Sequence, residues 1–404
     1  MRPAGAAEEE RLMKYNFDEI VDRRGTDCLK YDFGMKRKGR NDLLPMWVAD
    51  MDFKLPDVIL EDLHKRVDHG IFGYTDPLDD YFEALNHWYS TRYGFTIEPE
   101  WVTLGAGLVY GVHIAVQAFT KPGDGVMVMQ PVYYPFSEAI KQNGRKLVNN
   151  QLHYDGKYSI DFEDMEKKVK EENVKVLIFC SPHNPVGRVW TKEEIQKVAD
   201  ICLENGVVMF VDEIHADFIF PGVKFTSCMT LEEKYVNNIV YFSSPGKTFN
   251  IAGLQSANIV IANPELRATF KKANTSAGYS QGSCMGQFAL ISCYNKGAEW
   301  VDQMVEYIWG NVQYMKKFIE ENLPKAHFVD PEGTYLTWVD FTDYGFTPEQ
   351  LEKIMLDDAK LWLDSGVIFG PATALFERFN LACPRSVVEQ AMKQLKEAID
   401  KNTK

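Results

Sequence analysis

The stretch VKVLIFCSPHNPVGRVWTKEEIQKVADICLENGVVMFVD, residues 174–212, decides the fold. It begins and ends with apolar runs, 174–180 and 206–212, which are rich in Val and Ile and predict strands buried on both faces. Between them, the Thr-x-x-Glu pattern at Thr191 is typical of a capping box that opens a helix, and Gly206 closes it. A strand, a helix and a second strand in this order predict an α/β domain with helices covering the sheet.

Working outward, the same kind of apolar run recurs on both sides, at 125–132, 238–243 and 257–263. We therefore predict one mostly parallel sheet between about residues 100 and 295. Further along, one apolar stripe from Trp300 to Ile319 predicts a long amphipathic helix whose aromatic residues belong to the core.

The segment 335–341 alternates like a strand with one buried face, and two helical segments follow it, so we predict a smaller α+β domain there. The predicted division is an N-terminal arm that packs on the small domain or on a partner subunit, a large cofactor-binding domain and a small C-terminal domain, over residues 1–55, 56–295 and 296–404.

Composition excludes several classes of protein. The 404 residues carry a formal net charge of −14 with no basic stretch, which argues against nucleic-acid binding. No apolar run approaches the roughly 18 residues that a membrane span needs, and the first residues lack the apolar segment of a secretory signal. Seven scattered cysteines without a CxxC pair predict buried thiols and no zinc site. We expect a cytoplasmic protein that binds neither nucleic acid, membrane nor metal.

The stretch SSPGKTF, 243–249, ends like a phosphate-binding P-loop. A P-loop has a glycine five positions before the Gly of Gly-Lys-Thr, and here that position is Tyr241, inside a predicted strand. This excludes the nucleotide-binding interpretation of Lys247. The stretch GAGLVYG, 105–111, is a weak match to the dinucleotide fingerprint, spaced GxGxxxG. Small residues before an apolar helix over 108–119 can nevertheless hold one phosphate, although a plain glycine turn is the alternative.

Three polar residues come directly after predicted strands, namely Asn184, Asp212 and Lys247. Because the carboxyl ends of strands in an open parallel sheet meet at one crevice, these side chains are expected to face one pocket. Taken singly, each has a plainer explanation, since Asn184 can shape a turn, Asp212 can cap a helix and Lys247 can be solvated.

Together, their chemistry describes one cofactor. A buried carboxylate such as Asp212 needs a nearby cation, which a protonated pyridine supplies. Lys247 can form a Schiff base with an aldehyde, and Asn184 can donate to a phenolate oxygen. The 105–108 turn can hold a phosphate, and an aromatic ring from 131–136 can stack on a ring. An aldehyde, a pyridinium, a phenolate and a phosphate together describe pyridoxal 5′-phosphate (PLP).

The sequence resembles fold-type I PLP-dependent enzymes of the class I/II aminotransferase superfamily, and within them the MalY/PatB-like cystathionine β-lyase (C–S lyase) branch, which includes cystalysin. The motifs that carry the resemblance run along almost the whole chain. They are PMWVADMDF (45–53), GYT (73–75), AFTKPGDGV (118–126), PVYYPF (131–136), SPHNPVGRVW (181–190), DEIHADF (212–218), SPGKTFNIAGL (244–254), GTYLTWVDF (333–341) and FERFNLACPRS (376–386).

The resemblance implies an aspartate aminotransferase-like fold and a set of cofactor contacts. Lys247 would form the Schiff base and shuttle protons, Asp212 would pair with the pyridine nitrogen, and Asn184 would contact the ring oxygen. Tyr133 would stack on the ring. The remaining cofactor contacts would come from Ala106, Gly107, Leu108, His215 and Ser244, and from Tyr74 of a neighbouring subunit, which implies a homodimer.

On the substrate side, the resemblance implies that Arg378 binds the α-carboxylate, with Arg385 as its rival for that role. It also places Tyr134, Ala49 and Asp50 at the substrate. His215 and Gln255 stand where aspartate aminotransferases have a tyrosine and a phosphate-binding arginine, which favours the lyase branch.

The implied function is β-elimination of sulfur amino acids, giving pyruvate, ammonia and a thiol, with an L-amino-acid aminotransferase as the alternative because both reactions use the same residues. A PLP-binding regulatory protein is a less favoured alternative, because it would be expected to show an added DNA-binding segment and we see none in the sequence. Two features depart from the branch. Gly246 replaces the usual Ser or Thr before the lysine, and the loop FGPATALFER, 369–378, lacks the usual glycines, so Pro371 to Leu375 bear on side-chain specificity.

Overall fold

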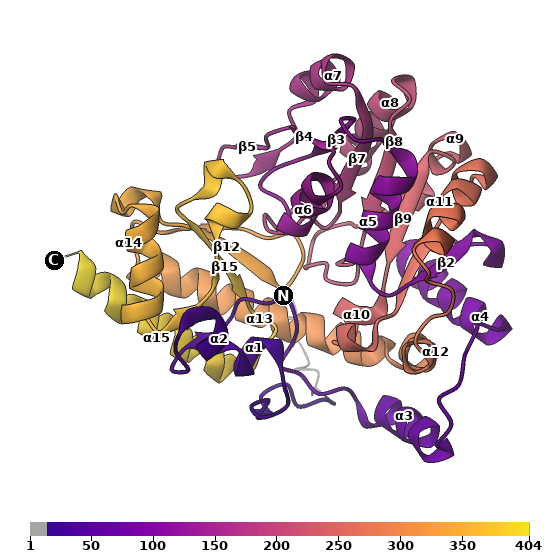
Figure 1. Cartoon of the computed structure of the whole chain (residues 1–404). Coiled ribbons are helices and arrows are strands. Elements are labelled where there is room, and N and C mark those ends of the chain that lie inside the picture. The colour runs from indigo at the N-terminus through magenta and orange to yellow at the C-terminus, as the bar shows by residue number, and fades with distance from the viewer. Residues whose placement is uncertain (1–13, 404) are drawn as a thin grey trace, which may run out of the picture.

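The computed structural model describes residues 14–403 and contains a seven-stranded and a four-stranded sheet, together with two short strand pairs (Figure 1). In the large sheet only β10 runs against its neighbours, so the predicted mostly parallel sheet is confirmed. Its strands, in spatial order, are β2 (Val102–Gly105), β10 (Ala257–Val260), β9 (Ile239–Ser243), β8 (Val208–Asp212), β7 (Val174–Cys180), β3 (Gly125–Val128) and β4 (Lys146–Asn149).

The strands of this sheet are buried on both faces, as their apolar runs predict. Along β7, Val176 and Ile178 join a core cluster on one face, while Leu177 and Phe179 join the main cluster on the other, as the two-residue period of a strand requires. Helices α5 (Leu108–Phe119), α6 (Tyr134–Gln142) and α11 (Pro264–Ser276) cover the first face. The second is covered mainly by α4 (Asp79–Trp88), α7 (Phe162–Glu171), α8 (Lys192–Glu204) and α12 (Cys284–Lys296).

Helix α8 shows why the local pattern at 191–206 was informative. The Thr191 hydroxyl accepts from the N–H of Glu194, and the Glu194 carboxylate accepts from the N–H of Thr191, so the predicted capping box is confirmed. Helix α5 has the bounds 108–119 predicted for it. The remaining helices of this part are α3 (Asp57–His69), α9 (Glu233–Val236) and the short α10 (Pro245–Thr248).

The smaller sheet has the order β11 (His327–Val329), β12 (Leu336–Asp340), β15 (Phe376–Asn380) and β14 (Asp364–Ser365). The predicted strand at 335–341 exists as β12, but the expectation of one buried face is wrong. The Thr337 hydroxyl contacts Met315 of α13 (Ala298–Asn322), whereas Trp338 donates to the Tyr158 hydroxyl at 3.2 Å. Both faces are therefore covered, one by the long helix and the other by a hairpin, β5 (His153–Tyr154) and β6 (Tyr158–Ser159). The two helical segments that follow are α14 (Pro348–Lys353) and α15 (Arg385–Asn402).

The N-terminal segment lies against the smaller sheet and its helices (Figure 1). It contains α1 (Leu29–Asp32), α2 (Gly34–Lys38) and β1 (Leu44–Pro45), which pairs in parallel with β13 (Leu361–Trp362). Phe17 packs against Trp300 and Tyr307 of α13, with ring centroids 5.9 and 5.5 Å apart. The domain boundaries at 55/56 and 295/296 stay a prediction.

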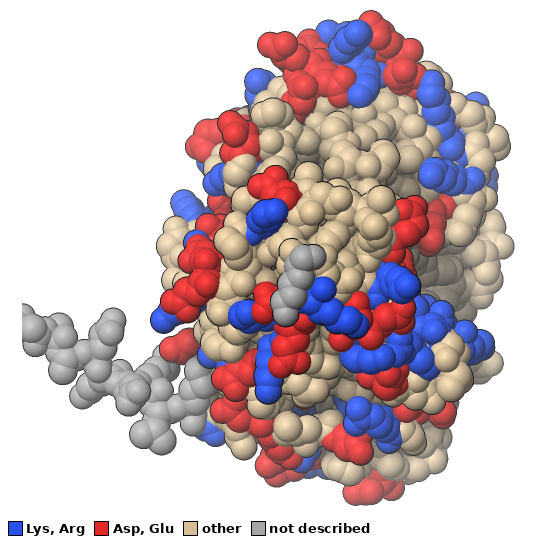
Figure 2. All heavy atoms as spheres, turned by 90° about the vertical axis from the view of Figure 1, so that its left-hand side faces the viewer, with Lys and Arg blue, Asp and Glu red and all other residues tan. Residues whose placement is uncertain are grey.

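Both acidic and basic side chains occur over the face shown in Figure 2. All seven cysteines carry free thiols; five are buried, while Cys28 and Cys284 are partly exposed, which corrects the expectation that every thiol is buried. Within residues 14–403, no helix has the length and apolar character required to span a bilayer.

Candidate active site

The carboxyl ends of β7, β8 and β9 form one edge of a cavity. Cys180 pairs with Asp212, and Asp212 with Phe242, so three neighbouring strands end at the same level. Residues that follow each of these strands line a cavity of about 380 Å³. The residues of the sequence prediction that line it are Ala49, Ala106, Gly107, Leu108, Tyr133, Asn184, Asp212, His215, Ser244 and Lys247.

Lys247 lies on α10, directly after β9, and its side chain enters the cavity. Its Nζ donates a hydrogen bond to the carbonyl oxygen of Ala49. Burial, together with the nearby cation Arg378, lowers the pKa of Lys247 to about 8, although the carboxylates of Asp50 and Asp212 oppose this shift. About a tenth of the amine is then unprotonated at pH 7, and the unprotonated amine is the state that acts as nucleophile or base.

Asp212 ends β8 and points a buried carboxylate into the same cavity. Its Oδ1 accepts from the backbone N–H of Ile214 at 3.0 Å, and among the described residues no hydrogen bond reaches Oδ2. Burial raises the pKa of Asp212 to about 6, although Ile214 and Lys247 lower it in part. The carboxylate therefore has room and electrostatic need for a cationic partner.

This buried acid makes the stability of the cofactor-free protein depend on pH. A carboxyl whose pKa rises from 3.8 to about 6 on folding stabilises the fold below about pH 3.8 relative to higher pH, and this contribution is lost as pH rises to about 6 and above. The shift of about two pKa units corresponds to about 3 kcal/mol. We expect cofactor-free Asp212→Asn to be more stable than wild type at pH 8 by up to that amount, and the difference to vanish near pH 4. Urea unfolding at both pH values measures it; a pH-independent difference would contradict the assignment.

Another part of the cavity lining suits an anion. Ala106, Gly107 and Leu108 line it where α5 begins, and the first helical N–H bonded to a carbonyl four residues back is that of Gly111. The preceding N–H groups and the helix dipole point positive charge toward the cavity. Ser244 also lines the cavity, but its hydroxyl donates to the carbonyl of Ser256 and accepts from the Gly246 N–H at 3.0 Å. A contact of Ser244 with a phosphate stays a prediction.

Gly246, directly before Lys247, is closely surrounded by other atoms. A Cβ at this position would lie 3.0 Å from the Ser244 hydroxyl oxygen and 3.3 Å from the Cα of Ala252. The Ser or Thr that the branch usually carries would need a small shift of these neighbours. The close packing of α10 against Ala252 therefore favours glycine at position 246. The effect of Gly246 on the reaction stays a prediction.

Two further predicted side chains, Tyr133 and His215, line the cavity. Tyr133 precedes α6 and is half-buried there. His215 is buried, and burial together with the nearby cations Lys247 and Arg378 holds its pKa well below the usual value, so the imidazole is neutral. Its Nδ1 has no hydrogen-bond partner among the described residues. This unpaired atom in the cavity wall fits a site that is completed by a bound polar group.

The sequence prediction missed Tyr335. Its ring lies 5.6 Å from that of His215, and its hydroxyl donates to the carbonyl of Ala49 at 3.0 Å, the same oxygen that Lys247 contacts. The residue lies within the motif GTYLTWVDF, so the motif marked its segment, but nothing in the pattern indicated the direction of its side chain.

Arg378 is fully buried on β15; it does not itself line the cavity, but it contacts Asn184, which does. Its Nη1 donates to the Oδ1 of Asn184 at 2.9 Å, and its Nη2 donates to the Trp47 carbonyl at 2.9 Å and to the Asp364 carboxylate. Asn184 lines the cavity described above, whereas Trp47 and Asp364 line a larger cleft of about 1070 Å³. Arg378 therefore stands between the two, and Asp364 is its buried ion-pair partner, which the sequence prediction did not include.

Four further predicted residues lie outside the cavity. The rival Arg385 donates through Nε to Asn311 of α13 at 2.7 Å, and the preference for Arg378 as the carboxylate ligand stays a prediction. Tyr134 lines the larger cleft. The Asp50 carboxylate lies 2.7 Å from Arg23 and does not line the cavity, so its role as a substrate ligand stays a prediction. Tyr74 is 97% exposed in the single chain.

The donor set of the cavity fits PLP. The amine of Lys247 suits an aldehyde, the carboxylate of Asp212 a protonated pyridine nitrogen, Asn184 a phenolate oxygen, and the start of α5 a phosphate. No group of three or more metal-ligating side chains occurs among residues 14–403.

The comparison with protein families agrees with this geometry. The family described as aminotransferase class I and II matches residues 42–395 of the chain. The chain belongs to this family. Among curated proteins, it is similar to cystathionine beta-lyase PatB of Bacillus subtilis, with 40% identity over 385 residues that cover 95% of this chain and 100% of PatB.

Solved structures of this family include two similar to the present one. The crystal structure of cystalysin from Treponema denticola, which contains a PLP cofactor, has a TM-score of 0.93 and 39% identity, covering 96% of this chain and 100% of that one. The PLP-bound C–S lyase from Staphylococcus hominis has a TM-score of 0.88 and 34% identity, covering 96% and 99%. The predicted family and fold are thereby confirmed.

Proposed function

We propose that this protein is a PLP-dependent C–S β-lyase that cleaves cystathionine-type sulfur amino acids to pyruvate, ammonia and a thiol. The observation that carries the proposal is that Lys247, with its lowered pKa, lines one cavity together with the buried carboxylate of Asp212 and with Asn184, the partner of Arg378. The similarity to PatB and to two PLP-containing relatives, one of them a C–S lyase, over nearly the whole chain supports it.

PLP, when bound, supplies an aldehyde that condenses with amines and an electron-withdrawing pyridinium ring. Asp212 would keep the ring nitrogen protonated, and Asn184 and His215 would face the ring oxygen side. Tyr133 would lie against the ring, while the N–H groups at the start of α5 would hold the phosphate. Tyr74 of a second subunit would complete the phosphate site.

Different residues of this chain then bind the amino acid and transfer its proton. Arg378 holds the α-carboxylate by charge-assisted hydrogen bonds and so fixes the orientation of the Cα–H bond. Lys247 removes the Cα proton. The electron pair of that bond moves into the Cα–Cβ bond, and the Cβ–S bond breaks with its pair on sulfur. The proton held by Lys247 goes to the departing thiolate, and water later releases pyruvate and ammonia.

Exposed apolar side chains support the proposed homodimer, and free thiols support the proposed cytoplasmic location. In the single chain the segment around Tyr74 exposes apolar side chains, among them Ile71, at 66%, and Leu78, at 74%. An exposed apolar run of this kind suits burial against a second copy of the chain. Free cysteines without disulfides suit a reducing compartment.

The decisive assay asks whether the reaction needs a keto-acid acceptor. With L-cystathionine as the only substrate, the holoenzyme is expected to release pyruvate and thiol continuously, because elimination regenerates the cofactor without an acceptor. Lactate dehydrogenase coupling measures pyruvate, and a thiol reagent measures the second product. Turnover only in the presence of a keto acid, with accumulation of pyridoxamine phosphate, would contradict the proposal and identify an aminotransferase.

A further inference from the structure

One short segment contacts both of the side chains on which the proposed reaction depends. We refer to residues 46–52 as the strap. The carbonyl oxygen of Trp47 accepts from Arg378 Nη2 at 2.9 Å, and the carbonyl oxygen of Ala49 accepts from Lys247 Nζ. The backbone of the strap thus helps to place the predicted carboxylate anchor and the predicted proton carrier at once.

The strap is tied to the elements that carry these residues. The side-chain amide of Asn380, two positions after Arg378 on β15, donates to the carbonyls of Val48 and Asp50. On the other side, Asn250, shortly after Lys247, exchanges two hydrogen bonds with the backbone of Met51, at 2.9 and 2.7 Å. A displacement of the strap would therefore be transmitted to both α10 and β15.

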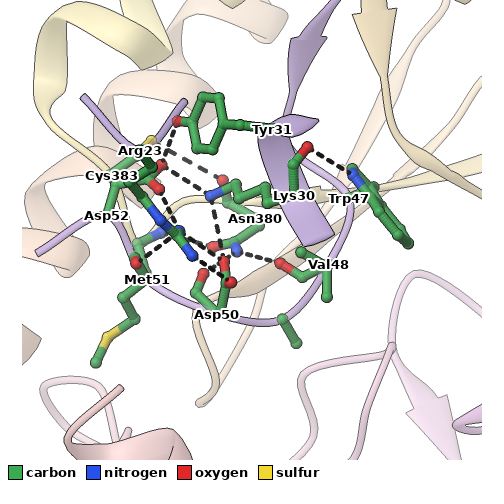
Figure 3. A network of polar contacts seen from close by, with 12 residues as sticks. Arg23, Lys30, Tyr31, Trp47, Val48, Asp50, Met51, Asp52, Asn380 and Cys383 are labelled. Atoms are coloured by element: carbon green, nitrogen blue, oxygen red, sulfur yellow. Dashed lines mark hydrogen bonds and ion pairs between the residues drawn. The ribbon is translucent and has the colours of Figure 1, made fainter. Parts of the chain in front are cut away.

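One arginine of the N-terminal segment holds the strap (Figure 3). Arg23 contacts three consecutive residues of the strap. Its Nη2 lies 2.7 Å from Asp50 Oδ2, and its Nη1 lies 2.7 Å from Asp52 Oδ1 and 3.1 Å from the Met51 carbonyl. A planar guanidinium can span such a set of oxygens, and a lysine ammonium can reach only part of it.

A second cation completes the charge balance in Figure 3. Lys30, whose side chain is 1% exposed, lies 2.8 Å from Asp52 Oδ2 and 3.8 Å from Asp50 Oδ1. The hydroxyl of Tyr31 donates to Asp52 Oδ2 at 3.0 Å. Two cations thus face two carboxylates, and because the pairs are largely buried, loss of one partner leaves an uncompensated charge in the network.

We propose that Arg23, acting through Asp50 and Asp52, is a positioning residue that holds the strap in the register in which Trp47 and Ala49 orient Arg378 and Lys247. The role rests on the proposed function, since it concerns binding of an amino-acid carboxylate at Arg378. Arg23 lies in the N-terminal segment, outside both the cavity and the larger cleft, so it acts only through the strap. Small displacements of positioning groups are enough to weaken binding strongly.

The test compares Arg23→Gln with Arg24→Gln in the holoenzyme. Arg24 is the matched control, because its side chain is 66% exposed and its nearest carboxylate is the exposed Asp22 at 3.6 Å. We expect Arg23→Gln to speed amide hydrogen exchange in peptides that cover residues 46–52 and to raise the KM for L-cystathionine about tenfold, with a smaller change in kcat. Arg24→Gln should change neither, and Arg23→Lys should restore part of the loss.

A third readout does not depend on C–S cleavage. L-Alanine carries the α-carboxylate but no sulfur, so its apparent Kd, from the visible absorbance of the holoenzyme, should also rise about tenfold in Arg23→Gln. If wild type binds L-alanine but does not cleave L-cystathionine, the lyase proposal fails while the role of Arg23 is still tested.

Two outcomes would overturn the inference. One is an unchanged Kd in Arg23→Gln; the other is equal acceleration of exchange in all peptides, which would indicate a general loss of stability. If Arg23→Gln does not fold, the double variant Arg23→Gln/Asp50→Asn replaces it, because it removes one charge of each sign and leaves the net charge of the network unchanged. The same two outcomes would then overturn the inference.

Discussion

Lys247→Ala is expected to lower turnover of L-cystathionine at least about 10³-fold, the largest effect of any single substitution considered. The variant loses both the amine that can bond covalently to the cofactor and the base beside Cα, and positioned general acid–base groups alone contribute about 10² to 10⁴. The lowered pKa of about 8 places this amine near the pH at which it works. Coupled pyruvate assays measure the loss.

The covalent role of Lys247 has a separate readout. Borohydride treatment of the yellow wild-type protein should add the mass of the reduced cofactor to the peptide that contains residue 247, and the same treatment of Lys247→Ala should add nothing. Lys234→Ala is the matched control, because Lys234 lies just before the same strand and is solvent-exposed. A colourless wild type, or a cofactor fixed equally well in Lys247→Ala, would contradict the assignment.

Arg378→Met is expected to lower kcat/KM at least about 100-fold and to destabilise the protein by about 3–5 kcal/mol. The first effect follows from the loss of charge-assisted hydrogen bonds to the substrate carboxylate. The second follows because Asp364, buried and paired with Arg378, would keep a charge without a partner. Steady-state kinetics and urea unfolding measure the two effects.

The two effects can be separated by a second substitution. In Arg378→Met/Asp364→Asn the unpaired charge is gone, so stability should largely recover while kcat/KM stays low. Arg385→Met serves as the control, since Arg385 contacts Asn311 and is expected to leave KM unchanged. If activity returns together with stability in the double variant, Arg378 is a structural residue and the carboxylate lies elsewhere.

Much of the fold could be predicted because its signals are local. The two apolar runs of 174–212 became β7 and β8, and the capping box at Thr191 opened α8, since each depends on residues within one turn or one strand. Asn184, Asp212 and Lys247 were brought to one cavity for a topological reason, because the carboxyl ends of parallel strands meet at the same edge of the sheet.

The direction of individual side chains could not be read in the same way. Asp50 belongs to a motif that predicted a substrate contact, yet its carboxylate faces Arg23. No local pattern indicated the direction of the Tyr335 and Asp364 side chains, although one shares the Ala49 carbonyl with Lys247 and the other pairs with Arg378. Each of these contacts depends on a partner that another element supplies.

By itself, then, the sequence determined the α/β architecture, the strand-end residues and the family to which the chain belongs. Only the tertiary structure decided that β12 is buried on both faces, that Arg378 stands between two cavities and that Arg23 and Lys30 hold the strap. The physical reason is that a buried charge pairs with whichever polar or oppositely charged group the completed fold brings within hydrogen-bonding distance. Arg378, for example, donates to the carbonyl of Trp47, which lies 331 positions away in the chain.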